Sequence, residues 1–193
     1  MHYCTLVLGP DPEGQLQPYA GPGQRVDWFA IGGRYTGNLI LKQGATSGRV
    51  YGDAMPEFEV HLAMMPRPDD TAIGARGLHG TQHGPGVDQA RHGDVDWPVT
   101  PVASPAILVD HGQWHEPDDE AFTTGMVASM CRATVEMGAP IFADRLRDSY
   151  GVDSLAELEA LAEKQLAPWN EFVARRIAAC GQDVLVTVFD VHQ

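Results

Sequence analysis

The chain has 193 residues, of which 44% are hydrophobic, and its 26 acidic residues outnumber its 13 basic ones to give a formal charge of −13. A chain of this length normally forms one domain, and its negative charge disfavours direct binding to nucleic-acid phosphates or to anionic lipid. No segment has the pattern of a membrane span or a signal peptide, so we expect a cytoplasmic protein.

The first half of the chain predicts strands separated by loops. Residues 2–8 are short, rich in β-forming side chains and closed by Gly9 and Pro10, which predicts a first strand, and residues 10–24 predict a surface loop. Further strands are predicted at 38–42, at 57–64 and in a hairpin of 106–109 with 113–116. Residues 66–94 are rich in glycine, proline and histidine, which predicts a long loop that is either a lid or a disordered insertion.

The second half predicts helices between residues 120 and 180 and a strand at 184–191. Ser154 and Glu157 match a capping box at the start of one helix, and Pro168 is expected to break or kink that helix. These elements predict a single α+β domain over residues 1–193. Its mostly antiparallel sheet should contain both terminal strands, with the helices of the second half packed on one face.

Three cysteines, Cys4, Cys131 and Cys180, are widely spaced and include no C-x-x-C pair. This spacing predicts reduced thiols in the core and argues against a disulfide framework or a zinc site.

The segment 27–37, DWFAIGGRYTG, combines a carboxylate, three aromatic rings, a pair of glycines and an arginine. Two successive glycines can adopt positive φ and turn backbone N–H groups toward one point, and Arg34 adds a fork of donors suited to a carboxylate or phosphate. We therefore expect a small polar or anionic ligand here. The candidate binding residues are Asp27, Trp28, Gly32, Gly33, Arg34 and Tyr35. The alternative is a tight turn with Trp28 and Tyr35 in the core and Asp27 paired to Arg34.

Four segments, at 16–19, 27–35, 112–116 and 185–192, together resemble one group of proteins. That group is an uncharacterised family of bacteriophages and bacteria with a D-W-[YF]-x-I-G-G-R-[WY] signature, a G-x-W-H-E-like hairpin and a C-terminal D-x-H. This chain departs from the pattern after Glu116, where acidic residues and a helical insert replace a stretch rich in glycine and tryptophan. The resemblance implies which residues gather and leaves the reaction open.

Candidate catalytic residues come from the hairpin, with His115 and Glu116, and from the last strand, with Asp190 and His192. Residues two apart on a strand point to the same face, so Asp190 and His192 can address one site. Such a set can act as a general base oriented by an acid, or bind a divalent metal through His115, Asp190 and His192. The structural alternative is a histidine that only hydrogen-bonds a neighbouring strand.

Two hypotheses for the function follow. The first is a small-molecule enzyme, a hydrolase or lyase that works by acid–base or divalent-metal-assisted chemistry on a polar or anionic substrate. The second is a non-catalytic acidic binding protein of phage or mobile-element origin that targets another protein. The chain has no G-x-S-x-G elbow, P-loop or G-x-G-x-x-G motif, which disfavours serine hydrolases, P-loop enzymes and Rossmann enzymes.

Overall fold

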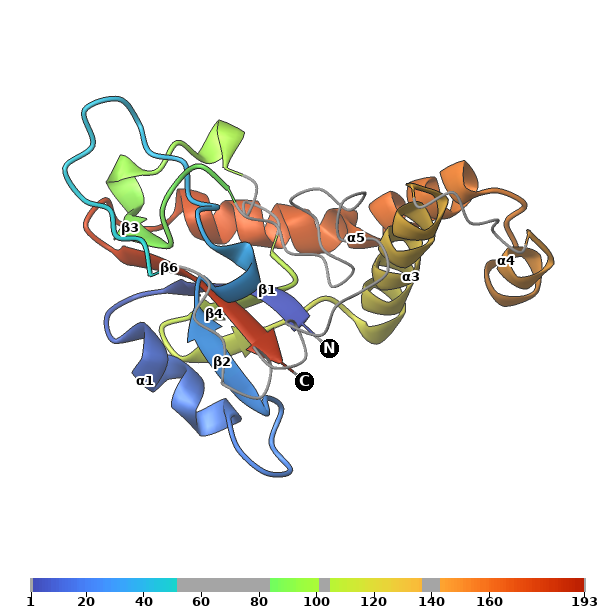
Figure 1. The fold of residues 1–193 in the computed structure, drawn as a ribbon, viewed down its shortest axis with the longest axis horizontal. Helices are drawn as coiled ribbons and strands as arrows, with labels where there is room; N and C mark the ends of the chain where they lie inside the picture. Colours follow the sequence, from blue (N-terminus) through green and yellow to red (C-terminus); the bar gives the residue numbers. More distant parts are fainter. Residues whose placement is uncertain (1, 52–83, 101–104, 137–142, 193) are drawn as a thin grey trace, which may run out of the picture. The chain divides into compact units, whose positions relative to one another are not determined.

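The computed structural model describes residues 2–51, 84–100, 105–136 and 143–192 (Figure 1). The chain divides into two compact units. The first unit consists of Met1–His115 with Arg176–Gln193, and the second is Glu116–Arg175. The second unit is thus an insertion in the sequence of the first.

The first unit is built on a six-stranded sheet in the order β2-β6-β1-β4-β5, with β3 also paired to β6. The strands are β1 (His2–Leu8), β2 (Trp28–Ile31), β3 (Gln89–Arg91), β4 (Ile107–Asp110), β5 (Gln113–His115) and β6 (Leu185–His192). Among these strands, β1 and β4 pair in parallel and the remaining pairs are antiparallel. The structure confirms the α+β class and the presence of both terminal strands in the sheet.

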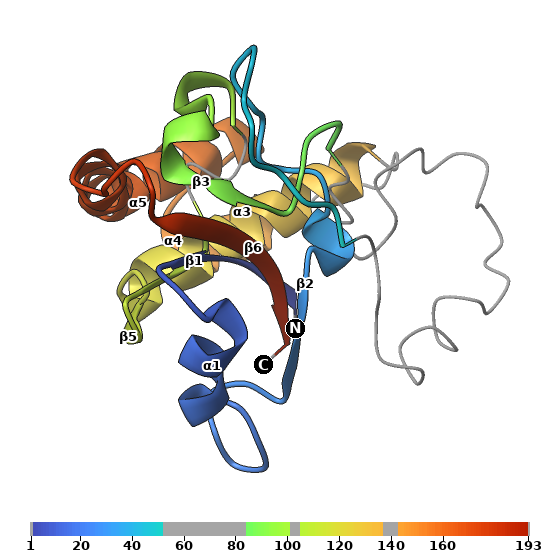
Figure 2. The same ribbon diagram turned by 90° about the vertical axis from the view of Figure 1, so that its left-hand side faces the viewer.

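The last strand, β6, occupies a central position in the sheet (Figure 2). One edge of β6 pairs with β1 along its length, and the other edge pairs first with β3 and then with β2. The two partners meet at Val188, whose N–H donates to the carbonyl of Asp88 at 2.8 Å and whose carbonyl accepts from the N–H of Gly32 at 2.9 Å. The glycine turn that follows β2 is therefore anchored at the middle of β6.

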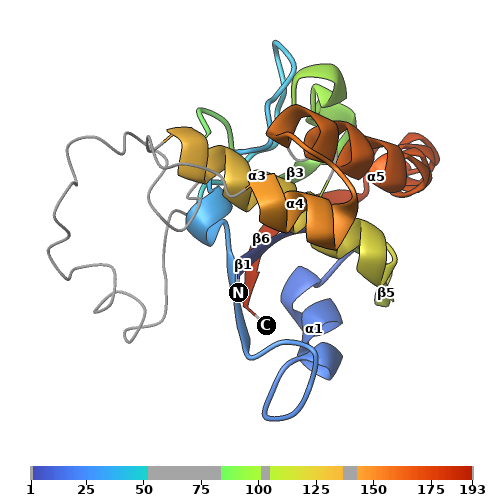
Figure 3. The same cartoon turned by 90° about the vertical axis from the view of Figure 1, so that its right-hand side faces the viewer.

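One face of the sheet packs against the helical segment α1 (Pro12–Leu16) and the 3-10 turn η1 (Gln17–Tyr19), as Figures 2 and 3 show. The side chain of Leu16 is fully buried in this core. Its buried members are Val7, Leu16, Val26, Ile107, Val109, Phe189 and Val191. The prediction of a surface loop over 10–24 is wrong in this part, because Leu16 fixes a short helix against the sheet.

The hairpin of β4 and β5 has the predicted position, with Asp110 opposite Gln113 and Val109 opposite Trp114. His111 and Gly112 form its two-residue turn at φ 48° and 80°. Positive φ at both central residues matches the strand twist, which explains the glycine in the turn.

The predicted loop of 66–94 is partly a packed segment. Residues 66–83, like the predicted strand at 57–64, lie outside the described residues, whereas 84–94 include β3 and the fully buried carboxylate of Asp88. This carboxylate accepts hydrogen bonds from the Thr36 hydroxyl at 2.9 Å, the Gly37 N–H at 2.5 Å and the Tyr51 N–H at 2.6 Å. The loop prediction is wrong for 84–94, because the buried carboxylate of Asp88 hydrogen-bonds this segment to residues 36–51.

The segment 38–42 was predicted to be a strand. It forms only isolated bridges, in which Leu39 pairs with Val87 and Leu41 with Val95. Leu39 is nevertheless fully buried. The apolar residues of 38–42 therefore indicated burial of this segment, which is not a regular strand.

The second unit contains α3 (Asp119–Glu136), α4 (Ala143–Tyr150) and most of α5 (Leu155–Ala178), which are visible in Figure 3. The Ser154 hydroxyl accepts from the Glu157 N–H at 3.2 Å, and the Glu157 carboxylate accepts from the Asp153 N–H at 2.7 Å. The cap at Ser154 is thus confirmed, although Glu157 reaches one residue further back than in an ideal capping box.

Of the break or kink predicted at Pro168, the break does not occur, because α5 continues through this residue. A proline inside a helix costs about 3 kcal/mol. Buried residues, among them Leu158 and Val173, lie before and after the proline in the helix. Within the described residues, every helix is too short or too polar to span a bilayer.

Candidate functional site

The first and last strands place two histidines side by side at one end of the sheet. In the antiparallel register His2 lies opposite His192, and His192 lies opposite Trp28 on its other side. The next row on the same face contains Cys4 and Asp190, since alternate residues of a strand share a face. We call His2, Asp27, Trp28, Asp190 and His192 the histidine cluster.

The three rings of the cluster are in mutual contact. The centroids of His2 and His192 are 5.0 Å apart with the rings inclined by 63°, and the His2 and Trp28 rings meet edge to face at 5.4 Å. The His192 ring stacks on the indole of Trp28, with a centroid distance of 5.6 Å and an interplanar angle of 5°. The indole therefore fixes the plane of one imidazole and limits the position of the other.

Each imidazole is paired with a different carboxylate through its Nδ1 atom. His2 Nδ1 lies 2.9 Å from Asp190 Oδ1, and His192 Nδ1 lies 3.1 Å from Asp27 Oδ2. Because an ionised carboxylate only accepts hydrogen bonds, these contacts place a hydrogen on Nδ1 and make Nε2 the basic nitrogen of a neutral ring. The cluster therefore contains two imidazoles in the same tautomer.

The two pairs differ in their exposure to solvent. The side chain of Asp190 is 0% exposed and that of His2 is 11% exposed, whereas His192 is 26% and Asp27 is 62% exposed. His2 is thus paired with a carboxylate that is shielded from solvent, and His192 with one that is exposed to it. A hydrogen bond to a buried charge restricts a ring more strongly than one to a solvated charge.

The glycine turn beside the cluster binds the carboxylate of Asp190. The Arg34 N–H donates to Asp190 Oδ2 at 3.1 Å, and the Arg34 Nε atom lies 3.9 Å from the same oxygen. Gly33 has φ +54°, and a Cβ atom there would lie 2.5 Å from Asp190 Cβ. The turn needs glycine because it approaches Asp190 too closely for any side chain.

Gly32, Gly33 and Arg34 were predicted to bind an external anion, and these contacts give the turn a carboxylate partner within the chain. The turn does present a donor to a carboxylate, but that carboxylate belongs to the chain itself. The Gly32 N–H bonds to Val188, and the Arg34 side chain is only 7% exposed. Asp27, which the alternative reading paired with Arg34, instead contacts His192.

His115 lies at the other edge of the sheet and is not part of the cluster. It pairs with Leu108 in β4, and both β4 and β1 separate it from β6. Three strand spacings of about 4.8 Å place β5 about 14 Å from β6, and the register adds about 13 Å along the strands. Glu116 belongs to the second unit. Within the first unit, the structure brings Asp190 and His192 together and leaves His115 apart from them.

The metal site predicted from His115, Asp190 and His192 is therefore not assembled. Within the residues that the structure describes, no three side chains of His, Cys, Asp or Glu are grouped as ligands for a metal ion.

Two further residues at the site are structural. Burial raises the pKa of the Cys4 thiol far above its usual value, and the negative charge of Asp190 raises it further, so Cys4 remains a protonated thiol. Burial likewise raises the pKa of Tyr35, whose hydroxyl donates to the backbone carbonyl of His2 at 3.2 Å. Tyr35, predicted to bind substrate, instead holds the start of β1.

His2 is the residue of this site that the sequence analysis missed. Part of its signal was the prediction that both terminal strands belong to one mostly antiparallel sheet. If the two strands are antiparallel neighbours, residue 2 lies close to residue 192. The register of that pair could not be derived from two short hydrophobic segments.

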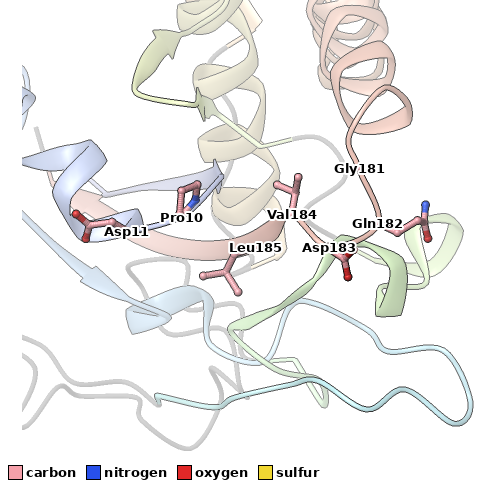
Figure 4. A pocket seen from close by; sticks show the side chains of 7 residues that line it. All are labelled: Pro10, Asp11, Gly181, Gln182, Asp183, Val184 and Leu185. Carbon is pink, nitrogen blue, oxygen red and sulfur yellow. The ribbon is translucent and has the colours of Figure 1, made fainter.

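An open depression of about 530 Å³ lies at the opposite end of β6 (Figure 4). It is lined by Pro10, Asp11, Gly181, Gln182, Asp183, Val184 and Leu185. Leu185 and His192 are the two ends of β6, which a rise of about 3.3 Å per residue places about 23 Å apart. The depression is therefore separate from the histidine cluster, and its lining contains no histidine or cysteine.

The fold and the cluster define a sheet protein with two adjacent histidine–carboxylate pairs on one face. No family model matches the chain, and no curated protein or solved structure gives a significant match.

Proposed function

We propose that the protein is a small-molecule hydrolase or lyase that works by general acid–base catalysis at the histidine cluster. The observation that supports this proposal best is the 2.9 Å contact between His2 Nδ1 and the fully buried Asp190. A buried carboxylate on Nδ1 fixes the ring and its tautomer, and it stabilises the imidazolium that forms when Nε2 takes a proton. His2 is therefore the proposed general base.

The second imidazole supplies the complementary proton transfer. His192 lies 5.0 Å from His2 between ring centroids, so the two rings can address two atoms of one small substrate. In a hydrolysis or elimination, His2 would remove a proton from water or from the substrate, and protonated His192 would donate one to the leaving group. Positioned proton transfer of this kind contributes about 10²- to 10⁴-fold to a rate.

Acid–base chemistry is the preferred form of the enzyme hypothesis because the described residues assemble two imidazoles without a third metal ligand. The binding-protein hypothesis receives no comparable support. The large apolar residues exposed in the described chain are Val50, Val99, Met130 and Val135, so the described surface offers no patch of large exposed aromatic rings.

The proposal is tested with a panel of ethyl carboxylic and phosphoric esters, whose alkoxide leaving group needs a proton, and with the variants His2→Gln and His192→Gln. Each variant should lower kcat/KM by about 10²-fold or more, because one proton transfer is lost. His111→Gln is the matched control, since His111 is 60% exposed in a hairpin turn and should keep full activity. Equal activity of all variants, or no turnover of any ester, would count against the proposal.

Asp190 is a positioning residue in this scheme, and its test needs a readout beyond rate. In Asp190→Asn the amide can donate as well as accept, so the Nδ1–H tautomer of His2 is no longer enforced. Ring ¹⁵N chemical shifts of His2 should show a mixture of tautomers in this variant and a single tautomer in the original protein. A single tautomer in both proteins would show that Asp190 acts only in folding.

A further inference from the structure

We infer that Asp27 makes the histidine cluster selective for cationic over anionic substrates, an inference that rests on the proposed function. The sequence suggested a polar or anionic ligand because of the Gly-Gly-Arg turn. That expectation depended on the turn being open to an external anion, whereas the turn binds Asp190.

Among the described residues, Arg34 places a positive charge beside Asp190 of the cluster, and this charge is buried. The Arg34 side chain is 7% exposed and lies 3.9 Å from Asp190 Oδ2, so its charge is largely balanced by that carboxylate. Arg25 is close in sequence, but its guanidinium lies 5.8 Å above the ring of Trp114, which packs against the core on the opposite face of the sheet. Neither arginine therefore presents its charge to a ligand at the two imidazoles.

The negative charge at the same place faces outward. The carboxylate of Asp27 is 62% exposed and lies 3.1 Å from His192 Nδ1. A ligand that reaches His192 therefore comes within a few ångströms of a solvated carboxylate. With neutral imidazoles, Asp27, Asp190 and Arg34 together leave an excess of one negative charge.

An aromatic surface adjoins this carboxylate. Trp28 follows Asp27 directly, its ring is stacked on His192, and the residue retains part of its surface in solvent. A carboxylate next to an indole is a favourable environment for an ammonium group, because ion pairing and the cation–π attraction act together. A sulfonate or phosphate at the same position is repelled by the carboxylate and gains nothing from the ring face.

The size of the effect follows from the exposure of Asp27. Two unit charges about 4 Å apart in bulk water interact by an amount that corresponds to about a fivefold change in an equilibrium constant. Asp27→Asn should therefore lower kcat/KM for a cationic substrate by about fivefold and raise it for an anionic substrate by a similar factor. Asp27→Lys should lower the ratio of kcat/KM for the cationic substrate to kcat/KM for the anionic substrate by a larger factor. The lysine repels the cation that the carboxylate attracts.

The experiment uses a matched pair of p-nitrophenyl esters, one of a trimethylammonium-bearing butanoic acid and one of a sulfonate-bearing butanoic acid. They are assayed at mildly alkaline pH, where an ordinary imidazole is neutral. The p-nitrophenolate group leaves as an anion, so turnover of these esters requires only the general base His2. The original protein should prefer the cationic ester. The preference should disappear in Asp27→Asn, invert in Asp27→Lys and weaken at high salt, because salt screens exposed charges.

Asp183→Asn is the matched control. Its side chain is 96% exposed, and it lies in the turn two residues before β6, at the end of that strand about 23 Å from His192. This variant removes one negative charge from the whole protein without changing the cluster. It should leave the ratio of the two esters unchanged, and an equal response of Asp183→Asn and Asp27→Asn would overturn the inference.

A second measurement separates this inference from the proposed function. Tetramethylammonium and methanesulfonate are titrated separately while the ring signals of His2 and His192 are followed by NMR. If neither ester is hydrolysed but tetramethylammonium alone shifts these signals, and Asp27→Lys abolishes the shift, then the charge selectivity stands and the catalytic proposal fails. Hydrolysis without any charge preference in either measurement would overturn the selectivity of Asp27 and leave the catalytic proposal intact.

Discussion

A Cβ atom on Gly33 would lie 2.5 Å from the Cβ atom of Asp190, closer than real Cβ atoms approach other heavy atoms. This contact explains the second glycine of the turn, because the turn must reach Asp190 closely enough for the Arg34 N–H to donate to it. The segment 27–37, which contains this turn, thus stabilises the buried carboxylate of Asp190 in the last strand.

Gly33→Ala should destabilise the protein by about 2–4 kcal/mol, combining the strain of positive φ with an overpacked contact. Gly23→Ala is the matched control, because Gly23 has φ +75° and no heavy atom within 4 Å of an added Cβ. It should show only the conformational strain, about 1 kcal/mol. Urea unfolding of both variants measures the difference, and equal losses would show that the contact with Asp190 is not tight.

Asp190→Ala should cost about 3–5 kcal/mol, because it leaves the buried Arg34 without its negative partner. Asp27→Ala removes the other carboxylate of the cluster, but this one is 62% exposed and should cost less than about 1 kcal/mol. The two free energies of unfolding should therefore differ several-fold. Similar values would show that the pair of Asp190 with Arg34 contributes little to stability.

His92 should make the stability of the fold depend on pH. Burial lowers its pKa, the positive charge of Lys42 lowers it further, and the backbone carbonyl of Ile177 opposes these effects. The unfolded chain, with an ordinary pKa of about 6.5, therefore binds a proton more tightly than the folded protein does. The contribution of neutral His92 is complete above about pH 6.5 and is lost as the pH falls from there toward the lower folded pKa.

The measurement is the urea midpoint between about pH 7.5 and about pH 5.5, which should fall with acidification. His92→Phe should reduce this dependence, since phenylalanine can pack against Trp97 as the imidazole does at 5.3 Å. His111→Gln changes an exposed histidine and should leave the slope unaltered. An unchanged slope in His92→Phe would assign the pH dependence to other groups.

Cys4 should resist alkylation in the folded protein. Its pKa is raised by burial and by Asp190, and a thiol reacts with a maleimide through its thiolate. At about pH 8 we expect labelling of Cys4 to be at least about 100-fold slower in the native protein than in urea. Mass spectrometry of timed digests measures the two rates, and comparable rates would contradict the assigned burial of the thiol.

The sequence predicted the parts of the fold that depend on local patterns. The strand at His2–Leu8, the hairpin turn at His111 and Gly112, and the cap at Ser154 all follow from alternation or from backbone preferences. The continuation of α5 through Pro168 could not be derived, because it depends on tertiary burial on both sides of the proline.

The candidate site was predicted only in part, because some of its contacts follow from local spacing and others depend on the register of distant strands. Asp190 and His192 were chosen correctly as neighbours, since their spacing on a strand fixes their common face. The partner of Asp190 is His2, 188 positions away, and no local pattern indicates which residues of two distant strands lie opposite each other. His115 was expected at the site because its hairpin segment carries a histidine next to a carboxylate. The strand order places His115 in β5, at the edge of the sheet away from β6.

The central position of the final strand has a consequence for synthesis on the ribosome. β1, β2 and β3 are all translated before β6, and each of them hydrogen-bonds to it. Until Leu185–His192 leave the exit tunnel, these strands have edges without their β6 partner, and such edges favour pairing between nascent chains. The sheet can close only after these residues have left the ribosome, so its folding should be slow and sensitive to loss of the eight residues of β6.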